Sequence, residues 1–127
     1  MKLRIKGATL RLRLTQGEIA ALAHSGIVEE RVPFAASATL VYRLRSDPQA
    51  PEISASYHGG VLEIRIPEAT ARQWCASDQV TLAHSQPVPD GELLITLEKD
   101  FACLTPRAGE DESDNFPHPQ AQGGKTC

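Results

Sequence analysis

The chain has 127 residues, of which 41% are hydrophobic and 23% are charged, a composition typical of one soluble globular domain. No apolar run approaches the roughly 20 residues of a membrane-spanning helix, and the alternating start of the chain is unlike a secretion signal. Three cysteines without a CxxC spacing argue against a disulfide framework. The composition therefore predicts a cytoplasmic protein, because disulfides are rare in that compartment.

The net charge of -3 conceals an asymmetry between the two halves of the chain. Residues 1–58 hold eight Lys or Arg against five Asp or Glu, whereas residues 59–127 hold five against eleven. The first fourteen residues carry five positive charges and no acid, and four acids fall between Glu110 and Asp114. The sequence thus predicts a basic surface from the start of the chain and an acidic segment near its end.

Two alternating runs begin the chain on either side of Gly7. Residues 2–6 and Leu10–Leu14 each place apolar side chains on one face and charged ones on the other, which predicts a β-hairpin. Thr15 and Glu18 then have the spacing of a capping box, and Gly26 fits the end of the helix that follows. The strands expected next are Ile27–Val32 and Thr39–Leu44.

A proline-containing linker, residues 46–51, separates this unit from a second one with the same order of elements. Pro67 suits the first position of its helix, where a missing N–H costs nothing. The turn before its last strand is expected at residues 87–91, around two prolines and a glycine. The other expected elements are strand Ile53–Tyr57, strand Val61–Ile66, helix Glu68–Ala76, strand Val80–Ala83 and strand Glu92–Glu98.

The two units also match residue by residue, about 52 positions apart. Residues 6–14 resemble residues 58–66, Leu22 falls on Trp74, and Val28 falls on Val80. The sequence predicts an α+β fold of two duplicated ββαββ units, with mainly antiparallel sheet, two helices and a pseudo-two-fold axis. One domain is expected over residues 1–107, with copies at about 1–46 and 52–98. Two open sheets around a shared core and a closed, barrel-like sheet both remain compatible with the pattern.

The apolar faces of these elements predict the core. The composition from residue 108 to residue 127 predicts instead an extended or disordered tail, in which Phe116 could anchor the chain to the body. The expected core residues are Leu3, Ile5, Leu10, Leu12, Leu14, Ile19, Leu22, Leu62, Ile64, Ile66, Trp74, Val80, Leu93 and Ile95.

Two groups of residues have the chemistry of a binding or reactive site. Cys103 and His118, with the acids at 110–114, include every common type of metal ligand but show no familiar ligand spacing. Arg4, Arg11 and Arg13 lie on strands in which charged and apolar residues alternate, and their side chains would suit an anion or phosphate. Nucleic acid is disfavoured, because no exposed aromatic residues are interleaved with these cations and the chain is acidic overall.

Two stretches resemble a family of small uncharacterised bacterial proteins, a domain of unknown function. The first is Arg4-Ile5-Lys6-Gly7 followed by the run from Leu10 to Thr15, and the second runs from Glu98 through Asp100-Phe101 to Phe116-Pro117. The resemblance covers nearly the whole chain and implies no activity, cofactor or catalytic residue. It does imply that the segment through Pro117 belongs to the folded unit.

No common catalytic signature is present in the sequence. We therefore expect a small non-enzymatic binding or adaptor protein that meets another protein through a sheet edge or the acidic tail. One alternative is a metal- or thiol-dependent enzyme that uses Cys103 with His118 or the acidic tail. A second alternative is an anion-binding protein that uses Arg4, Arg11 and Arg13.

Overall fold

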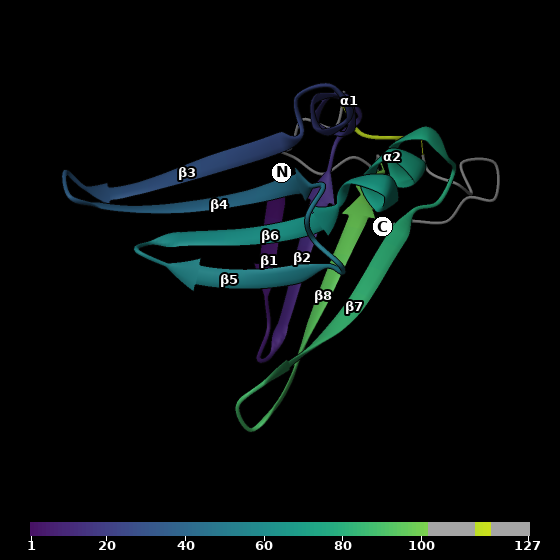
Figure 1. Ribbon diagram of the computed structural model, residues 1–127. Coiled ribbons are helices and arrows are strands. Elements are labelled where there is room, and N and C mark those ends of the chain that lie inside the picture. The colour runs from purple at the N-terminus through teal and green to yellow at the C-terminus, as the bar shows by residue number, and fades with distance from the viewer. Residues whose placement is uncertain (102–113, 118–127) are drawn as a thin grey trace, which may run out of the picture.

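The computed structural model describes residues 1–101 and 114–117. Within these residues it is an α+β protein of two helices and eight strands, with both helices at one end of two splayed sheets (Figure 1). Neither of these helices is long and apolar enough to cross a membrane. The elements are β1 (Lys2–Ile5), β2 (Thr9–Leu14), α1 (Gln16–Ser25), β3 (Ile27–Ala35), β4 (Ala38–Asp47), β5 (Ser54–His58), β6 (Val61–Pro67), α2 (Glu68–Ala76), β7 (Thr81–Val88) and β8 (Gly91–Lys99).

The strands form two open four-stranded sheets and not one closed barrel, which decides between the two alternatives that the sequence left open. Sheet A has the order β1-β2-β8-β7, and sheet B has the order β3-β4-β6-β5. Each hairpin is antiparallel, as predicted, but the central pair of each sheet is parallel. The parallel pairs arise because each sheet takes one hairpin from each half of the chain.

The strand registers show the internal duplication. Lys2 pairs with Arg13 between β1 and β2, and Ser54 pairs with Arg65 between β5 and β6, so both partners move by 52 positions. A rotation that exchanges the two copies therefore also exchanges sheet A with sheet B. This is the pseudo-two-fold arrangement that the repeat predicts.

The later strands of the two copies are offset by more than 52 positions. Val28 pairs with Leu44 in sheet B, and Leu82 pairs with Leu97 at the same place in sheet A. The expected match of Val28 with Val80 is therefore wrong, and Val28 corresponds instead to Leu82. The connection between α2 and β7 is longer than the one between α1 and β3, which increases the offset between the two copies. The strand β7 also continues through Pro87, where a turn was expected, because an edge strand tolerates proline.

The core lies between the two sheets and beneath both helices. Leu22 and Trp74, from equivalent positions of α1 and α2, are both buried, as the repeat predicts. Ile5 was expected in this core but is 60% exposed, because it lies on an edge strand close to the hairpin turn. The largest fully buried side chains are Trp74, Leu12, Leu14, Leu22, Leu44, Ile64, Ile66, Ile95 and Leu97.

The ends of the helices follow their local sequence. The Thr15 hydroxyl accepts from the Glu18 N–H at 3.3 Å, and the Glu18 carboxylate accepts from the Thr15 N–H at 2.9 Å, which completes the predicted capping box. Gly26 ends α1 at a φ of 78°, a left-handed conformation that favours glycine. Pro67 was predicted at the first position of α2, but it occupies the N-cap position just before Glu68 and makes no side-chain capping hydrogen bond.

Residues 114–117 pack against the end of sheet A and the start of α1. The Asp114 carbonyl accepts from the Gln16 N–H at 3.0 Å, and the Phe116 N–H donates to the Asp100 carbonyl at 2.7 Å. The ring of Phe116 lies 5.3 Å from that of Phe101, measured between centroids. These contacts are those expected of an anchor at Phe116.

Candidate anion-binding face

The outer face of sheet A carries a row of cationic side chains. Charged and apolar residues alternate along β1 and β2, so the pleat of the strands places the cations on the side away from the core. The register puts Lys2 opposite Arg13 and Arg4 opposite Arg11. We call this surface the basic face, and it consists of Lys2, Arg4, Lys6, Arg11 and Arg13.

Two acids at the end of β8 neutralise part of the basic face. The Glu98 carboxylate lies 3.1 Å from Arg13 Nε and 3.5 Å from Arg11 Nε. Lys2 Nζ lies 3.1 Å from the buried Asp100 carboxylate. Three of the five cations are therefore engaged by acids within the same sheet.

Arg4 and Lys6 form no ion pair with any residue that the structure describes. Together with Arg11 they line a hollow of about 160 Å³, whose remaining lining residues are Thr9, Leu10, Leu94 and Thr96. Guanidinium, ammonium and hydroxyl groups are the donors that carboxylate and phosphate oxygens accept. The hollow thus has the chemistry of an anion site.

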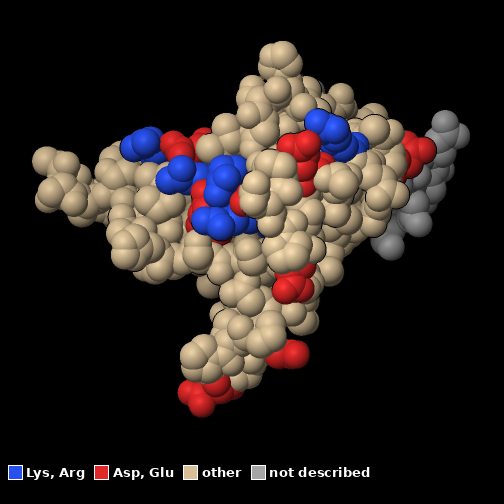
Figure 2. All heavy atoms as spheres, in the orientation of Figure 1, with Lys and Arg blue, Asp and Glu red and all other residues tan. Residues whose placement is uncertain are grey.

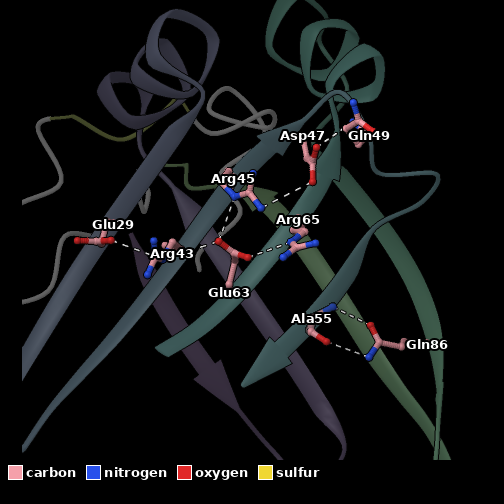
Figure 3. A network of polar contacts seen from close by, with 9 residues as sticks. All are labelled: Glu29, Arg43, Arg45, Asp47, Gln49, Ala55, Glu63, Arg65 and Gln86. Carbon is pink, nitrogen blue, oxygen red and sulfur yellow. Dashed lines mark hydrogen bonds and ion pairs between the residues drawn. The ribbon is translucent and has the colours of Figure 1, made fainter. Parts of the chain in front are cut away.

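The outer face of sheet B is also rich in arginine, but its central arginines each have a carboxylate within 4 Å (Figure 3). Glu63 lies at the centre, with a carboxylate oxygen 3.0 Å from Arg45 Nε and the other 2.9 Å from Arg65 Nε. Arg43 Nε lies 3.9 Å from Glu63 and 3.5 Å from Glu29. We call these five residues the sheet B network.

The hydrogen bond from Arg45 holds the pKa of Glu63 below its ordinary value, despite the burial of the carboxylate, and Arg65 acts in the same direction. The same hydrogen bond raises the pKa of Arg45. Figure 2 shows the result on the surface, where blue and red side chains are interleaved over β4 and β6. The cations of this face are therefore already occupied by carboxylates.

The duplication allows the two faces to be compared position by position. The strands β1 and β5 pair with β2 and β6 in the same register, so each position of β1 has an equivalent position in β5. The positions that are cationic in the first copy are uncharged in the second. The residues equivalent to Lys2, Arg4 and Lys6 are, in order, Ser54, Ser56 and His58. One copy thus carries three positive charges where the other carries hydroxyls and an imidazole.

The structure brings the three predicted anion-binding residues, Arg4, Arg11 and Arg13, onto one face. The predicted site did not include Lys2 and Lys6, although the alternation of residues 2–6 places both on the same side as Arg4. It also gave no indication of Glu98, because a strand near residue 98 could lie beside any other strand of the fold.

The second predicted site falls outside the described residues, where Cys103 and His118 both lie. In residues 1–101 and 114–117 no group of three His, Cys, Asp or Glu side chains is placed to hold a metal ion. The described thiol, Cys75, is half-buried on α2, and burial raises its pKa, which disfavours the reactive thiolate. Use of Cys103 or His118 by an enzyme remains a prediction.

Comparisons with known proteins identify one family for this chain. Residues 1–120 match the family of unknown function DUF7009, and the chain belongs to that family. Comparison with curated proteins and comparison with solved structures give no match. The family resemblance expected from the sequence is thereby confirmed, and the match includes the segment around Phe116.

Proposed function

We propose that this member of the DUF7009 family is a small non-enzymatic binding protein of the cytoplasm, and that its basic face binds an anionic partner. The observation that supports the proposal is the divergence between the two copies. Where β5 presents uncharged hydroxyl residues and a histidine, the equivalent positions of the first copy are Lys2 and Arg4 in β1 and Lys6 directly after it.

The arrangement of these cations favours a partner with several negative charges. Alternate residues of a strand lie about 7 Å apart, so the row presents positive charge at regular intervals along one direction. Two acids, Glu98 and Asp100, are paired with three of the five cations of the face. The surplus attracts anions over about 10 Å at moderate salt and more weakly as salt is added.

Binding of poly-L-glutamate, measured by calorimetry at low salt, tests this function. We expect the doubly substituted variant Arg4→Ser/Lys6→Ser to bind about tenfold more weakly than the unaltered protein, because it loses both cations of the basic face that have no acid partner among the described residues. The binding constant of the unaltered protein should also fall steeply with added salt.

A matched control removes the same amount of charge from other surfaces. Arg31 in β3 and Arg72 in α2 have side chains that are 67% and 78% exposed and lie outside the basic face. The variant Arg31→Ser/Arg72→Ser should bind poly-L-glutamate within twofold of the unaltered protein. Equal weakening in both variants, or no binding by the unaltered protein, would contradict the proposal.

A further inference from the structure

The free edges of β5 and β1 differ, although the two strands are equivalent. At β5, the side chain of Gln86 from β7 closes the edge (Figure 3). Its amide oxygen accepts from the Ala55 N–H at 2.7 Å, and its amide nitrogen donates to the Ala55 carbonyl at 3.0 Å. A glutamine side chain thus takes the place that a neighbouring strand would occupy.

At β1 no described residue closes the corresponding backbone groups in this way. The paired bonds between Lys6 and Thr9, at 3.2 and 3.1 Å, mark a hydrogen-bonded position of the hairpin. Because these positions alternate in an antiparallel pair, the N–H and C=O groups of Leu3 and Ile5 point away from β2. Among the described residues these groups have no hydrogen-bonding partner across the edge.

The residue at the position of Gln86 in the first copy is Val32. Val32 pairs with Leu40 in sheet B, at the register place where Gln86 pairs with Leu93 in sheet A. A valine side chain has no group that can donate to or accept from a backbone edge. The substitution explains why the edge of β1 remains open.

The two sides of this edge differ in chemistry. On the outer side, β1 presents the cations Lys2 and Arg4, and Lys6 follows directly after the strand. On the inner side, Ile5 is 60% exposed and Val32 on the facing edge strand is 36% exposed. A strand added here would have alternate side chains against positive charge and against apolar surface.

We propose that the edge of β1 binds an extended protein segment as an additional strand, and that acidic residues alternate with apolar ones in that segment. This inference rests on the proposed function, because the acidic side chains would meet the basic face. The backbone of the segment would pair with Leu3 and Ile5, and its apolar side chains would cover Ile5. A strand of four residues, Lys2–Ile5, fits a segment of about five residues.

A protein segment fits this surface better than a nucleic acid does. The neutral residues among the cations are Thr9, Leu10, Leu94 and Thr96, none of which offers an aromatic ring for a base to stack on. The open backbone groups favour a ligand with its own N–H and C=O groups at regular intervals. These features are matched by a β-strand and not by a phosphate backbone.

Peptide binding to the full chain tests the inference. The probe is an acetylated seven-residue peptide of alternating glutamate and valine, and its control has the same composition with all glutamates grouped at one end. We expect the alternating peptide to bind at least about tenfold more tightly. N-methylation of the peptide amides that face β1 should abolish that preference, because it removes edge hydrogen bonds without changing charge.

Two variants transfer the edge-closing side chain. Val32→Gln should weaken binding of the alternating peptide by about tenfold while leaving poly-L-glutamate binding unchanged, because no charge is altered. The matched change Gln86→Val, on the opposite side of the molecule, should leave binding at β1 unchanged. Hydrogen exchange should show slower exchange of the Leu3 and Ile5 amides when the alternating peptide is bound.

The outcomes separate this inference from the proposed function. Equal affinity for the alternating, grouped and methylated peptides, without protection of Leu3 and Ile5, would overturn strand addition and leave anion binding intact. Tight binding of single-stranded nucleic acid together with weak binding of every peptide would also overturn it. Failure of both peptides and poly-L-glutamate to bind would remove the proposed function itself.

Discussion

The outer faces of sheets A and B share one register and yet differ in how their charges are balanced. In sheet B, Glu63 lies among three arginines, and each cation of the sheet B network has a carboxylate partner. In sheet A, Glu98 holds Arg11 and Arg13, while Arg4 and Lys6 have no acid among the described residues. The comparison suggests that sheet B uses its charges for structure, whereas sheet A has charge available for a ligand.

At two pairs of equivalent positions, one copy has an acid where the other has an arginine. Arg11 of β2 is equivalent to Glu63 of β6, and Glu98 of β8 is equivalent to Arg45 of β4, as the parallel pairings show. An acid and a base therefore meet across the central strands of both sheets, with their strands exchanged. Because this pairing is kept in both sheets, the surplus charge of sheet A comes from the residues of β1 and the lysine that follows it.

The largest effect is expected from moving the cationic row between the sheets. Replacement of the three cations of β1 by the residues of β5 (Lys2→Ser, Arg4→Ser and Lys6→His) should weaken poly-L-glutamate binding by about 100-fold. The reverse transfer into β5 of that variant (Ser54→Lys, Ser56→Arg and His58→Lys) should restore much of the affinity. Calorimetry at low salt measures both, and a transfer that restores nothing would show that charge alone does not define the site.

A smaller effect is expected when the sheet B network loses its central acid. Glu63→Gln should lower the free energy of unfolding by about 1 kcal/mol at neutral pH, because Arg45 and Arg65 lose a charged acceptor. The pKa of Glu63 is lower in the folded protein than in the unfolded chain, so its contribution is present above the ordinary pKa and is lost as the pH falls through the folded value. The gap between the two proteins in urea unfolding should therefore close below about pH 4.

The matched variant for that experiment is Glu92→Gln, which removes one carboxylate from the exposed start of β8. Its stability should differ from that of the unaltered protein by less than about 0.5 kcal/mol. If Glu63→Gln and Glu92→Gln have equal effects at neutral pH, the network contributes no more to stability than an isolated surface charge.

The smallest effect is expected from Glu98→Gln in sheet A. This change releases Arg11 and Arg13 from their acid, so affinity for poly-L-glutamate should rise about threefold at low salt. The increase should disappear at about 1 M salt, where charges are screened within a few ångströms. An affinity that falls would indicate that Glu98 positions the two arginines for the ligand.

The sequence predicted the local elements well because each has a local cause. The capping box of Thr15 and Glu18, the end of α1 at Gly26, and the hairpin around Gly7 depend only on neighbouring residues. The alternation of Arg4 with Ile5 likewise identified the basic side of the strand. These features need no knowledge of which strands are neighbours in space.

The tertiary arrangement was less predictable, because it depends on pairings between distant residues. The central parallel pairs, the burial of Leu44 and Leu97, and the capping of Ala55 by Gln86 all follow from hairpins that associate across the two copies. The exposure of Ile5 has the same origin, since its alternation is that of a buried strand but its place is at an edge.

The exchange of hairpins between the copies has a consequence for the order in which the molecule can be assembled. All strands of sheet B lie within residues 27–67, whereas β2 of sheet A must pair with β8, from the other end of the folded region. Closing that longer loop carries the greater entropic cost. During synthesis, sheet B has all its strands once Pro67 has left the ribosome, whereas sheet A must wait for Lys99.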